Sequence, residues 1–291
     1  MLNCSQFTVH RFVIKVFEFS KPINLYVFGD VHRFAKGCAE DKWLQFLDTA
    51  KRDTNTFFLG MGDYDDLASM SERAILINPG LHDDTKWTID DVYTQRLQAF
   101  KKEIDFMRGR VIGLLEGNHY GVFSNGSMTT TQMLCEMMKC QYLGVNSFIR
   151  LSFVYGSKRT SLDIFAHHGK GASRLIGGSL NSVEHMVSNA EADIYLMGHD
   201  HQRNAGKLSR LHLRGGGDRL VLKDKTMILA RTGSFLRGYM PDHQSYVVRG
   251  AMKPSDIGYL KIILTPTREL QQDKRTGKRV DLMSIKMEAV V

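Results

Sequence analysis

The chain has 291 residues, of which 43% are hydrophobic and 24% charged, and its formal net charge is +8. This is the composition of a globular protein with ample length for a large core. No apolar run approaches the roughly 20 residues that a membrane-spanning helix needs, so no membrane partner is expected. Four cysteines without metal-binding spacing indicate free thiols, which favours a cytoplasmic protein.

The positive charge favours anionic partners, including nucleic acid, although a solvated basic face explains it equally well. The basic residues are spread along the chain. They are somewhat enriched after residue 200, at Arg203, Lys207, Arg210, Arg214, Arg219, Lys223, Lys225, Arg231 and Arg237.

The first half of the chain alternates strand-like and helix-like segments. The N-terminal segment alternates like a strand and lacks the continuous apolar region of a signal peptide. The elements expected next, in chain order, are a strand at 23–28, a helix at 38–53, a strand at 56–60, a long loop or insertion at 64–90, a helix at 91–109 and a strand at 110–117. In the first of these helices Trp43, Phe46, Leu47 and Ala50 share one face.

The second half becomes richer in strands. The expected elements are a helix at 129–140, strands at 147–156 and 162–166, a helix at 180–190, a strand at 193–197, and strands within 210–214, 219–222, 226–231, 244–252 and 257–264. Strands that alternate with helices predict a layered α/β sheet. We therefore expect one domain over 1–291, with the β-rich part 202–291 packed into the same body.

Short polar blocks follow five of these strands. In chain order they are Gly29-Asp30-Val31-His32, Gly62-Asp63, Gly117-Asn118-His119, His167-His168-Gly169 and Gly198-His199-Asp200-His201. Each contains a glycine, which permits a tight turn. Open α/β folds place ligand sites at the ends of strands.

The side chains in these blocks suit divalent cations such as Mn, Fe or Zn. Two residues separated by one position on an extended segment point to the same side, as Asp30 and His32 would. A lone carboxylate such as Asp63 can bridge two metals. For Asp200 the preferred interpretation is a turn residue, or a carboxylate that orients a ligand imidazole.

The five blocks together resemble the calcineurin-like metallophosphoesterases, whose pattern runs G-D-x-H, G-D, G-N-H, H and G-H-x-H in this order. They span residues 29–201, about two-thirds of the chain. The resemblance implies an α/β fold of two facing mixed β-sheets flanked by helices, in four αββα layers. It also implies two divalent metal ions, with Mn²⁺ favoured and Fe or Zn as alternatives.

The resemblance assigns a role to each block. Asp30, His32 and His201 would bind the first metal, Asp63 would bridge, and Asn118, His199 and one of His167 and His168 would bind the second. His167 is favoured over His168 because it directly follows the apolar strand. A metal-bound hydroxide would attack the phosphate ester, and His119 would be the acid that protonates the leaving oxygen.

The chain departs from the family pattern at two places. An acidic residue often follows the G-N-H block, but here it is Tyr120, so the group that supports His119 is an open question. The arginine-bearing signature that phosphoprotein phosphatases carry after the second block is absent, which argues against a serine/threonine phosphatase. Asp65 and Asp66, in the second block, are interpreted as turn residues.

Two stretches near the blocks could contact substrate. The Gly-rich segment 167–181 carries Lys170 and Arg174, although a flexible connection explains it equally well. The segment 231–239 could place Arg237 or Tyr239 near the site. The leading hypothesis is a phosphodiesterase acting on nucleic acid or nucleotides, which makes the chain a nuclease candidate. The alternatives are a phosphomonoesterase on a small molecule or phosphoprotein and a catalytically silent binding scaffold.

Overall fold

Two β-sheets form the centre of the molecule in the computed structural model, which describes residues 7–77, 80–171, 173, 175–214, 220–241, 246–272 and 279–291. The first sheet has six strands in the order β1-β5-β6-β7-β9-β8. Its strands are β1 (Thr8–Lys15), β5 (Asn146–Tyr155), β6 (Lys158–His167), β7 (Ile194–Met197), β8 (Arg203–Arg214) and β9 (Val221–Thr232).

The second sheet has five strands in the order β11-β10-β2-β3-β4. Its strands are β2 (Ile23–Phe28), β3 (Thr56–Gly60), β4 (Val111–Leu114), β10 (Leu260–Gln272) and β11 (Arg279–Val290). Both sheets are mixed: β2, β3 and β4 pair in parallel, while β10 is antiparallel to both β2 and β11.

The main apolar core lies between the two sheets. Leu25 and Leu59 come from the second sheet, and Ile164, Leu196 and Ile228 from the first; all five are buried in one cluster. Side chains on a strand alternate between its two faces, so each sheet turns one apolar face toward the other sheet and one toward helices.

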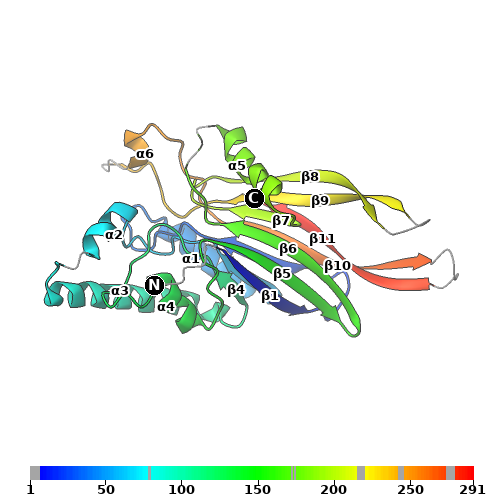
Figure 1. Cartoon of the computed structure of the whole chain (residues 1–291), viewed down its shortest axis with the longest axis horizontal. Helices are drawn as coiled ribbons and strands as arrows, with labels where there is room; N and C mark the ends of the chain where they lie inside the picture. The colour runs from blue at the N-terminus through cyan, green and yellow to red at the C-terminus, as the bar shows by residue number, and fades with distance from the viewer. Residues whose placement is uncertain are drawn as a thin grey trace.

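Helices cover the outer faces of both sheets (Figure 1). Three pack on the second sheet and one on the first: α1 (Glu40–Arg52), α3 (Asp83–Ile104) and α4 (Thr130–Met138), and on the other side α5 (Ile176–Asn189). The face expected for α1 is the buried one, with Trp43, Phe46, Leu47 and Ala50 inside. The fold class expected from the sequence, two facing mixed sheets flanked by helices, is confirmed.

The loop expected at 64–90 was wrong in two places. A short helix, α2 (Met70–Leu76), begins there, and α3 starts at Asp83 rather than at residue 91. The start of α2 is a capping box, because Ser69 accepts a hydrogen bond from the Glu72 backbone and the Glu72 side chain accepts one from Ser69. The first turns of α3 carry few apolar residues, so hydrophobic periodicity did not reveal them. The 3₁₀ helix η1 (Asp105–Met107) extends α3.

The strand expected within 244–252 was also wrong. Four of its described residues form a short helix instead, α6 (Tyr246–Arg249). The apolar residues there read as a strand, but Val247 packs under Gly238, whose added Cβ would lie only 2.6 Å from a Val247 methyl. Residues 221–222 and 226–231 of two expected strands lie within one strand, β9, while residue 219 is outside the described residues. β11 was not among the strands expected from the sequence.

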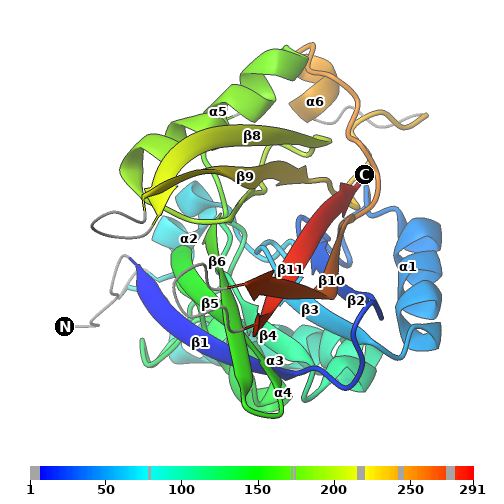
Figure 2. The same ribbon diagram turned by 90° about the vertical axis from the view of Figure 1, so that its right-hand side faces the viewer.

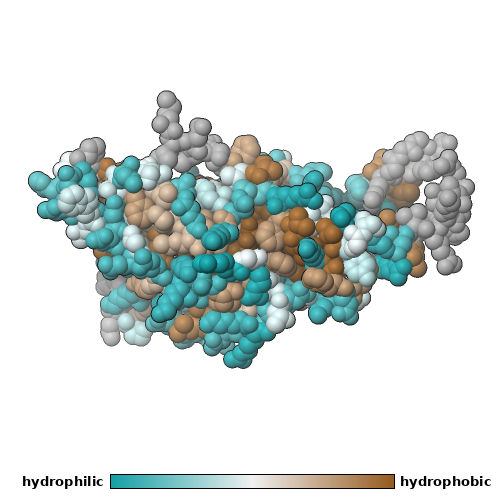
Figure 3. Space-filling view, turned by 90° about the horizontal axis from the view of Figure 1, so that it is seen from below, coloured by the Kyte–Doolittle hydropathy of each residue, from teal (hydrophilic) through white to brown (hydrophobic). Residues whose placement is uncertain are grey.

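Two long hairpins extend from one end of the body, β8 with β9 and β10 with β11 (Figures 1 and 2). From below, hydrophilic side chains cover much of the surface, and hydrophobic ones gather toward the middle and toward the hairpins (Figure 3). No helix among the described residues is long and apolar enough to cross a membrane.

Candidate metal centre

The five polar blocks meet at one edge of the two facing sheets. β2, β3 and β4 run in parallel, so the residues that follow them lie at the same edge of the second sheet. β6 and β7 are also parallel, and their ends reach the matching edge of the first sheet. The fold therefore assembles side chains that are up to 171 positions apart in the sequence, from Asp30 to His201.

A first cluster consists of Asp30, His32 and His201. The imidazole nitrogens and carboxylate oxygen that could bind a metal all lie within 4.8 Å of one another. His201 Nε2 is 3.5 Å from Asp30 Oδ1. Asp30 Oδ1 and His32 Nε2 are buried and have no hydrogen-bond partner among the described residues. Buried polar atoms normally have a partner, and these two are of the kinds that bind borderline divalent cations, so the cluster fits a metal ion.

A second cluster consists of Asp63, His168 and His199, again within 4.8 Å. Asn118 joins it, because its Oδ1 lies 2.9 Å from both His168 Nε2 and His199 Nδ1. Burial and the neighbouring His168 lower the pKa of His199 to about 4. Burial alone would lower the pKa of His168, but Asp63 and Asp30 raise it to about 9. The carboxylate, amide oxygen and imidazoles of this cluster are ligand types that fit a divalent ion once His168 gives up its proton.

Asp63 lies between the two clusters. Its Oδ2 is 3.8 Å from His32 Nε2 in the first and 3.4 Å from His168 Nε2 in the second. Its Oδ1 accepts hydrogen bonds from the backbone N–H groups of Asn118 and His119, at 2.7 and 2.8 Å. Burial alone would raise the pKa of Asp63, but His168 and the other imidazoles lower it well below its usual range.

The third block must carry a glycine because Asp63 packs directly against it. A Cβ added to Gly117 would lie 1.9 Å from Asp63 Oδ1. No side chain fits in that space without moving the carboxylate.

The backbone of the blocks differs from the extended segments expected from the sequence. Five candidate ligands have positive φ: Asp30 (47°), His32 (45°), Asp63 (50°), His199 (71°) and His201 (55°). Left-handed backbone, and not strand alternation, therefore directs the side chains of each i, i+2 pair. Such conformations are sparsely populated for residues other than glycine and concentrate at functional sites.

Of the two histidines at the end of β6, the structure brings His168 to the second cluster and leaves the favoured His167 outside it. His168, and not His167, lies with Asp63 and Asn118. In β6, Ala166 belongs to the core between the sheets and Phe165 to the layer under α5, so alternation turns His167 outward and His168 inward.

Local hydrogen bonds hold both imidazoles in place. His168 Nδ1 lies 2.7 Å from the Met61 carbonyl, which leaves Nε2 for the cluster. His167 Nδ1 instead accepts a hydrogen bond from the Gly169 backbone. A backbone carbonyl that fixes the ring of a metal-binding histidine is a common supporting contact.

His119 lies beside the clusters and is held by Asp66. Its Nδ1 is 2.8 Å from Asp66 Oδ1, and the same oxygen is 3.2 Å from His32 Nδ1. Hydrogen bonds from His119 and then His32 hold the pKa of Asp66 well below its usual range. Burial alone would lower the pKa of His119, but Asp66 and Asp63 raise it above its ordinary value. Asp66 is predicted from the sequence only as a turn residue, because its spacing carries no signal for this contact.

Asp200 points away from both clusters. It is buried, accepts a hydrogen bond from Ser179 Oγ and lies 3.4 Å from Arg231 Nε. Arg231 also donates to the carbonyls of Ser179 and Gly198, at 2.9 and 2.7 Å. Asp200 thus anchors the turn between His199 and His201, and among the described residues it makes no hydrogen bond or ion pair with a ligand imidazole.

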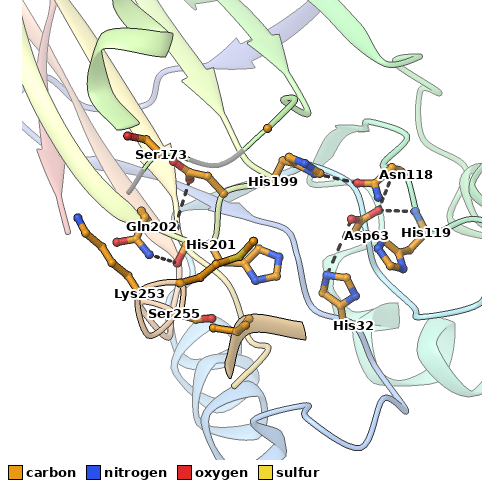
Figure 4. A pocket seen from close by; sticks show the side chains of 14 residues that line it. His32, Asp63, Asn118, His119, Ser173, His199, His201, Gln202, Lys253 and Ser255 are labelled. Carbon is orange, nitrogen blue, oxygen red and sulfur yellow. Dashed lines mark hydrogen bonds and ion pairs between the residues drawn. The ribbon is translucent and has the colours of Figure 1, made fainter. Parts of the chain in front are cut away.

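A cleft of about 450 Å³ opens over the clusters (Figure 4). Around Asp63, Figure 4 shows His32, Asn118 and His119 turned toward one another, while Lys253 and Gln202 lie on the opposite side. Seven residues that the sequence did not single out individually also line the cleft: Gly171, Ser173, Gln202, Val247, Met252, Lys253 and Ser255. They come from loops and from α6, where neither periodicity nor a motif marks them.

Three of the substrate contacts expected from the sequence, Lys170, Arg237 and Tyr239, do not line this cleft. Arg237 pairs with Asp41 at 2.5 Å, and the Tyr239 hydroxyl donates to the Met252 carbonyl at 2.8 Å. Lys170 is exposed and outside the lining, although its neighbour Gly171 belongs to it. Arg174 lies outside the described residues.

Comparisons with known proteins add little to this geometry. No family model and no curated protein matches the chain. Among solved structures, the chain is similar to a conserved uncharacterized protein from Streptococcus pneumoniae TIGR4, described as a predicted phosphoesterase. The two share 13% sequence identity over 92% of this chain and 99% of the other, with a TM-score of 0.31. The fold and the site therefore rest on the geometry of the chain itself.

Proposed function

We propose that the chain is a metal-dependent phosphoesterase of the calcineurin-like kind, with two divalent cations, Mn²⁺ being the first candidate. The observation that carries the proposal is the pair of buried clusters that share Asp63 between them. Asp30, His32 and His201 would hold one ion. Asn118, His168 and His199 would hold the other, with Asp63 serving both.

The cations, when bound, would supply positive charge for the phosphoryl oxygens and a nucleophile derived from water. The protein supplies the rest of the chemistry. His119 lines the cleft, and its Nδ1 is taken by Asp66, so Nε2 remains for the substrate. A protonated His119 would donate the Nε2 proton to the leaving oxygen as the P–O bond breaks.

The cleft favours a phosphodiester of nucleic acid or a nucleotide. Lys253 supplies a cation for a second phosphate or a backbone oxygen, and Val247 and Met252 supply an apolar wall for a base or sugar. The net charge of +8 favours a polyanion over a neutral partner.

A direct test compares three substrates with manganese present: bis-p-nitrophenyl phosphate, p-nitrophenyl phosphate and single-stranded DNA. We expect turnover of the diester and of DNA to exceed that of the monoester. The control is Asp63→Asn, which removes a negative charge between the two clusters and should lower both turnover and metal content. Preference for the monoester would support the monoesterase alternative. No turnover with any substrate, with metal bound, would support a silent scaffold.

A further inference from the structure

The basic residues that the sequence concentrates after residue 200 do not share one environment. Arg231 is buried with Asp200, and Arg237 pairs with Asp41. Most of the others lie on β8 and β9, which form an antiparallel hairpin. The register of the two strands therefore decides which face of the hairpin each of these cations occupies.

One face of the β8–β9 hairpin gathers three of these cations and a histidine. Arg210 lies directly opposite Lys225, and His212 lies directly opposite Lys223. Opposed residues of two antiparallel strands share a face, and so do residues two positions apart on one strand. The four side chains thus form two adjacent rows on one side of the hairpin. We call this set the cationic face.

The cationic face begins where the layer under α5 ends. Leu208 and Met227, the preceding row on the same side, still pack in the apolar cluster under α5. Beyond that row the hairpin extends away from the body of the molecule (Figure 1). Arg210 and His212 are exposed there. A ligand can therefore reach this side of the hairpin.

The charges of the cationic face are poorly balanced by the protein itself. Like charges placed directly opposite each other destabilise a sheet, and Arg210 opposes Lys225 in this way. Asp193 Oδ1 lies 3.6 Å from Lys225 Nζ. Within the described part of the chain, the side chains of Arg210, His212 and Lys223 make no hydrogen bond or ion pair. A negatively charged partner would remove this repulsion.

The opposite side of the hairpin is apolar. Leu211, Leu213 and Leu222 lie there and are exposed, and Asp224 lies opposite Leu211. A lipid surface contacts one side of a hairpin, and a membrane that took up these leucines would have the cations turned away from it. The placement of the cations therefore favours a hydrophilic polyanion over a lipid surface.

β9 connects the cationic face to the candidate metal centre. Arg231, near the end of β9, donates to the carbonyl of Gly198 in the fifth block. Lys225 lies six residues earlier on the same strand, and a strand rises about 3.3 Å per residue, so the separation is about 20 Å. A chain of several nucleotides can span this distance, whereas a small phosphate ester cannot.

We propose that the cationic face of the β8–β9 hairpin is a second binding surface for single-stranded nucleic acid, about 20 Å from the metal centre. The choice of nucleic acid rests on the proposed function, and the surface lies outside the cleft. Its cations contact phosphate oxygens, so it binds long chains better than short ones and adds no preference for base sequence.

The test is the salt dependence of binding in the double variant Arg210→Gln/Lys223→Gln, measured without added manganese so that hydrolysis does not compete. A labelled single strand of about 20 nucleotides reaches from the cleft to the hairpin even at about 3.4 Å per nucleotide, and a dinucleotide does not. We expect the log–log slope for the long strand to become shallower by about 1.4, which is about 0.7 for each cation. Binding of the dinucleotide should not change.

The matched control is Lys86→Gln/Lys101→Gln on α3. It makes the same change in net charge, at lysines that pair with Asp83 and Asp105 at 3.3 and 3.0 Å. Its slope for the long strand should stay nearly that of the wild-type protein. Equal slopes for the two double variants would overturn the proposal and assign the effect to net charge alone.

The fold of Arg210→Gln/Lys223→Gln is checked by urea unfolding. Its midpoint should not fall, because the substitutions remove like charges that face each other or lie on adjacent rows. Turnover of bis-p-nitrophenyl phosphate should equal that of the wild-type protein, since this ester does not extend to the hairpin. A loss of this turnover in the folded variant would contradict a surface that is separate from the cleft.

The outcomes separate this proposal from the proposed function. A shallower slope in a protein that turns over no phosphodiester would contradict the proposed function and support the hairpin surface. Turnover of DNA with an unchanged slope would do the reverse. Vesicles that contain phosphatidylserine test the other source of phosphate. If the double variant lost vesicle binding but kept oligonucleotide binding, the surface would belong to a membrane contact and the proposal would be wrong.

Discussion

The candidate ligands hold backbone conformations that cost free energy and that neighbouring segments enforce. Five of them have positive φ, and each such residue costs roughly 1–3 kcal/mol. The first two blocks are tied together, because Asp30 N–H donates to the Gly62 carbonyl at 2.9 Å and His32 N–H to the Asp63 carbonyl at 3.0 Å. Ser234 Oγ donates to the Asp30 carbonyl at 2.9 Å. Hydrogen bonds from neighbouring segments therefore hold the backbone of these ligands in place.

The histidine pair after β6 gives a prediction at the scale of one residue. His168→Ala should lower the metal content by one ion per chain, because it removes the imidazole that faces Asp63 and Asn118. His167→Ala, on the outer side of the strand, should keep both ions and is the matched control. Metal per chain is measured after dialysis against manganese. One ion lost from His167→Ala and none from His168→Ala would contradict the placement.

Most of the site was predictable because its residues lie in short polar blocks that directly follow strands. The sequence identified Asp30, His32, Asp63, Asn118, His119, His199 and His201, which the structure brings together. Glycine and polar residues at a strand end are a local signal. The sequence favours His167 because it directly follows the strand, but which face of a strand a residue occupies depends on what packs against each side. Asp66 gave no signal, because its contact with His119 bridges 53 positions and depends on how two loops meet.

At the scale of elements, β9 supports the turn that presents His199 and His201. Arg231 is only 1% exposed, and it pairs with Asp200 while donating to two carbonyls of the neighbouring segments. Asp200, the other member of this ion pair, is buried as well. The turn is thus attached to β9 through a buried ion pair, and this pair links β9 to the candidate metal centre.

Breaking this ion pair should destabilise the protein. Arg231→Met leaves the Asp200 carboxylate buried without its cation, which costs about 3–5 kcal/mol in comparable cases. Urea unfolding measures the loss. Adding Asp200→Asn to Arg231→Met should recover part of it. The control is Arg150→Met, which breaks the exposed pair with Asp163 and should leave the unfolding midpoint nearly unchanged. Equal midpoints for the two single variants would show that the buried pair does not anchor the turn.

Elements with strong periodicity were predicted well, and those set by tertiary contacts were not. β2 and β3 have the bounds expected from their apolar runs, and α1 buries the expected face. The start of α3 and the short helices α2 and α6 were missed. Their sequences are too short or too polar for a clear period, so capping and packing decide their structure.

At the scale of the whole molecule, the core between the sheets and the candidate site are continuous. Met61 is buried in that core, and its carbonyl accepts from His168 in the site. The apolar layer fixes the separation of the two sheets, and with it the separation of the blocks at their edges. Sequence patterning can predict each strand, but the distance between facing edges depends on how the whole core packs.

The net charge of +8 leads us to expect that binding of a polyanion depends on salt. If the cleft accepts single-stranded nucleic acid, affinity should fall steeply with salt, because each neutralised phosphate contributes a log–log slope of about −0.7. Lys253→Gln removes the cation that lines the cleft and should make the slope shallower by about 0.7. Lys101→Gln, on α3 and paired with Asp105, makes the same charge change outside the cleft and should leave the slope nearly unchanged.

Fluorescence anisotropy of a labelled oligonucleotide over a salt series measures the slope for both variants. A salt-independent affinity, or equal slopes for the two variants, would remove nucleic acid as the occupant of this cleft and favour a small phosphate ester.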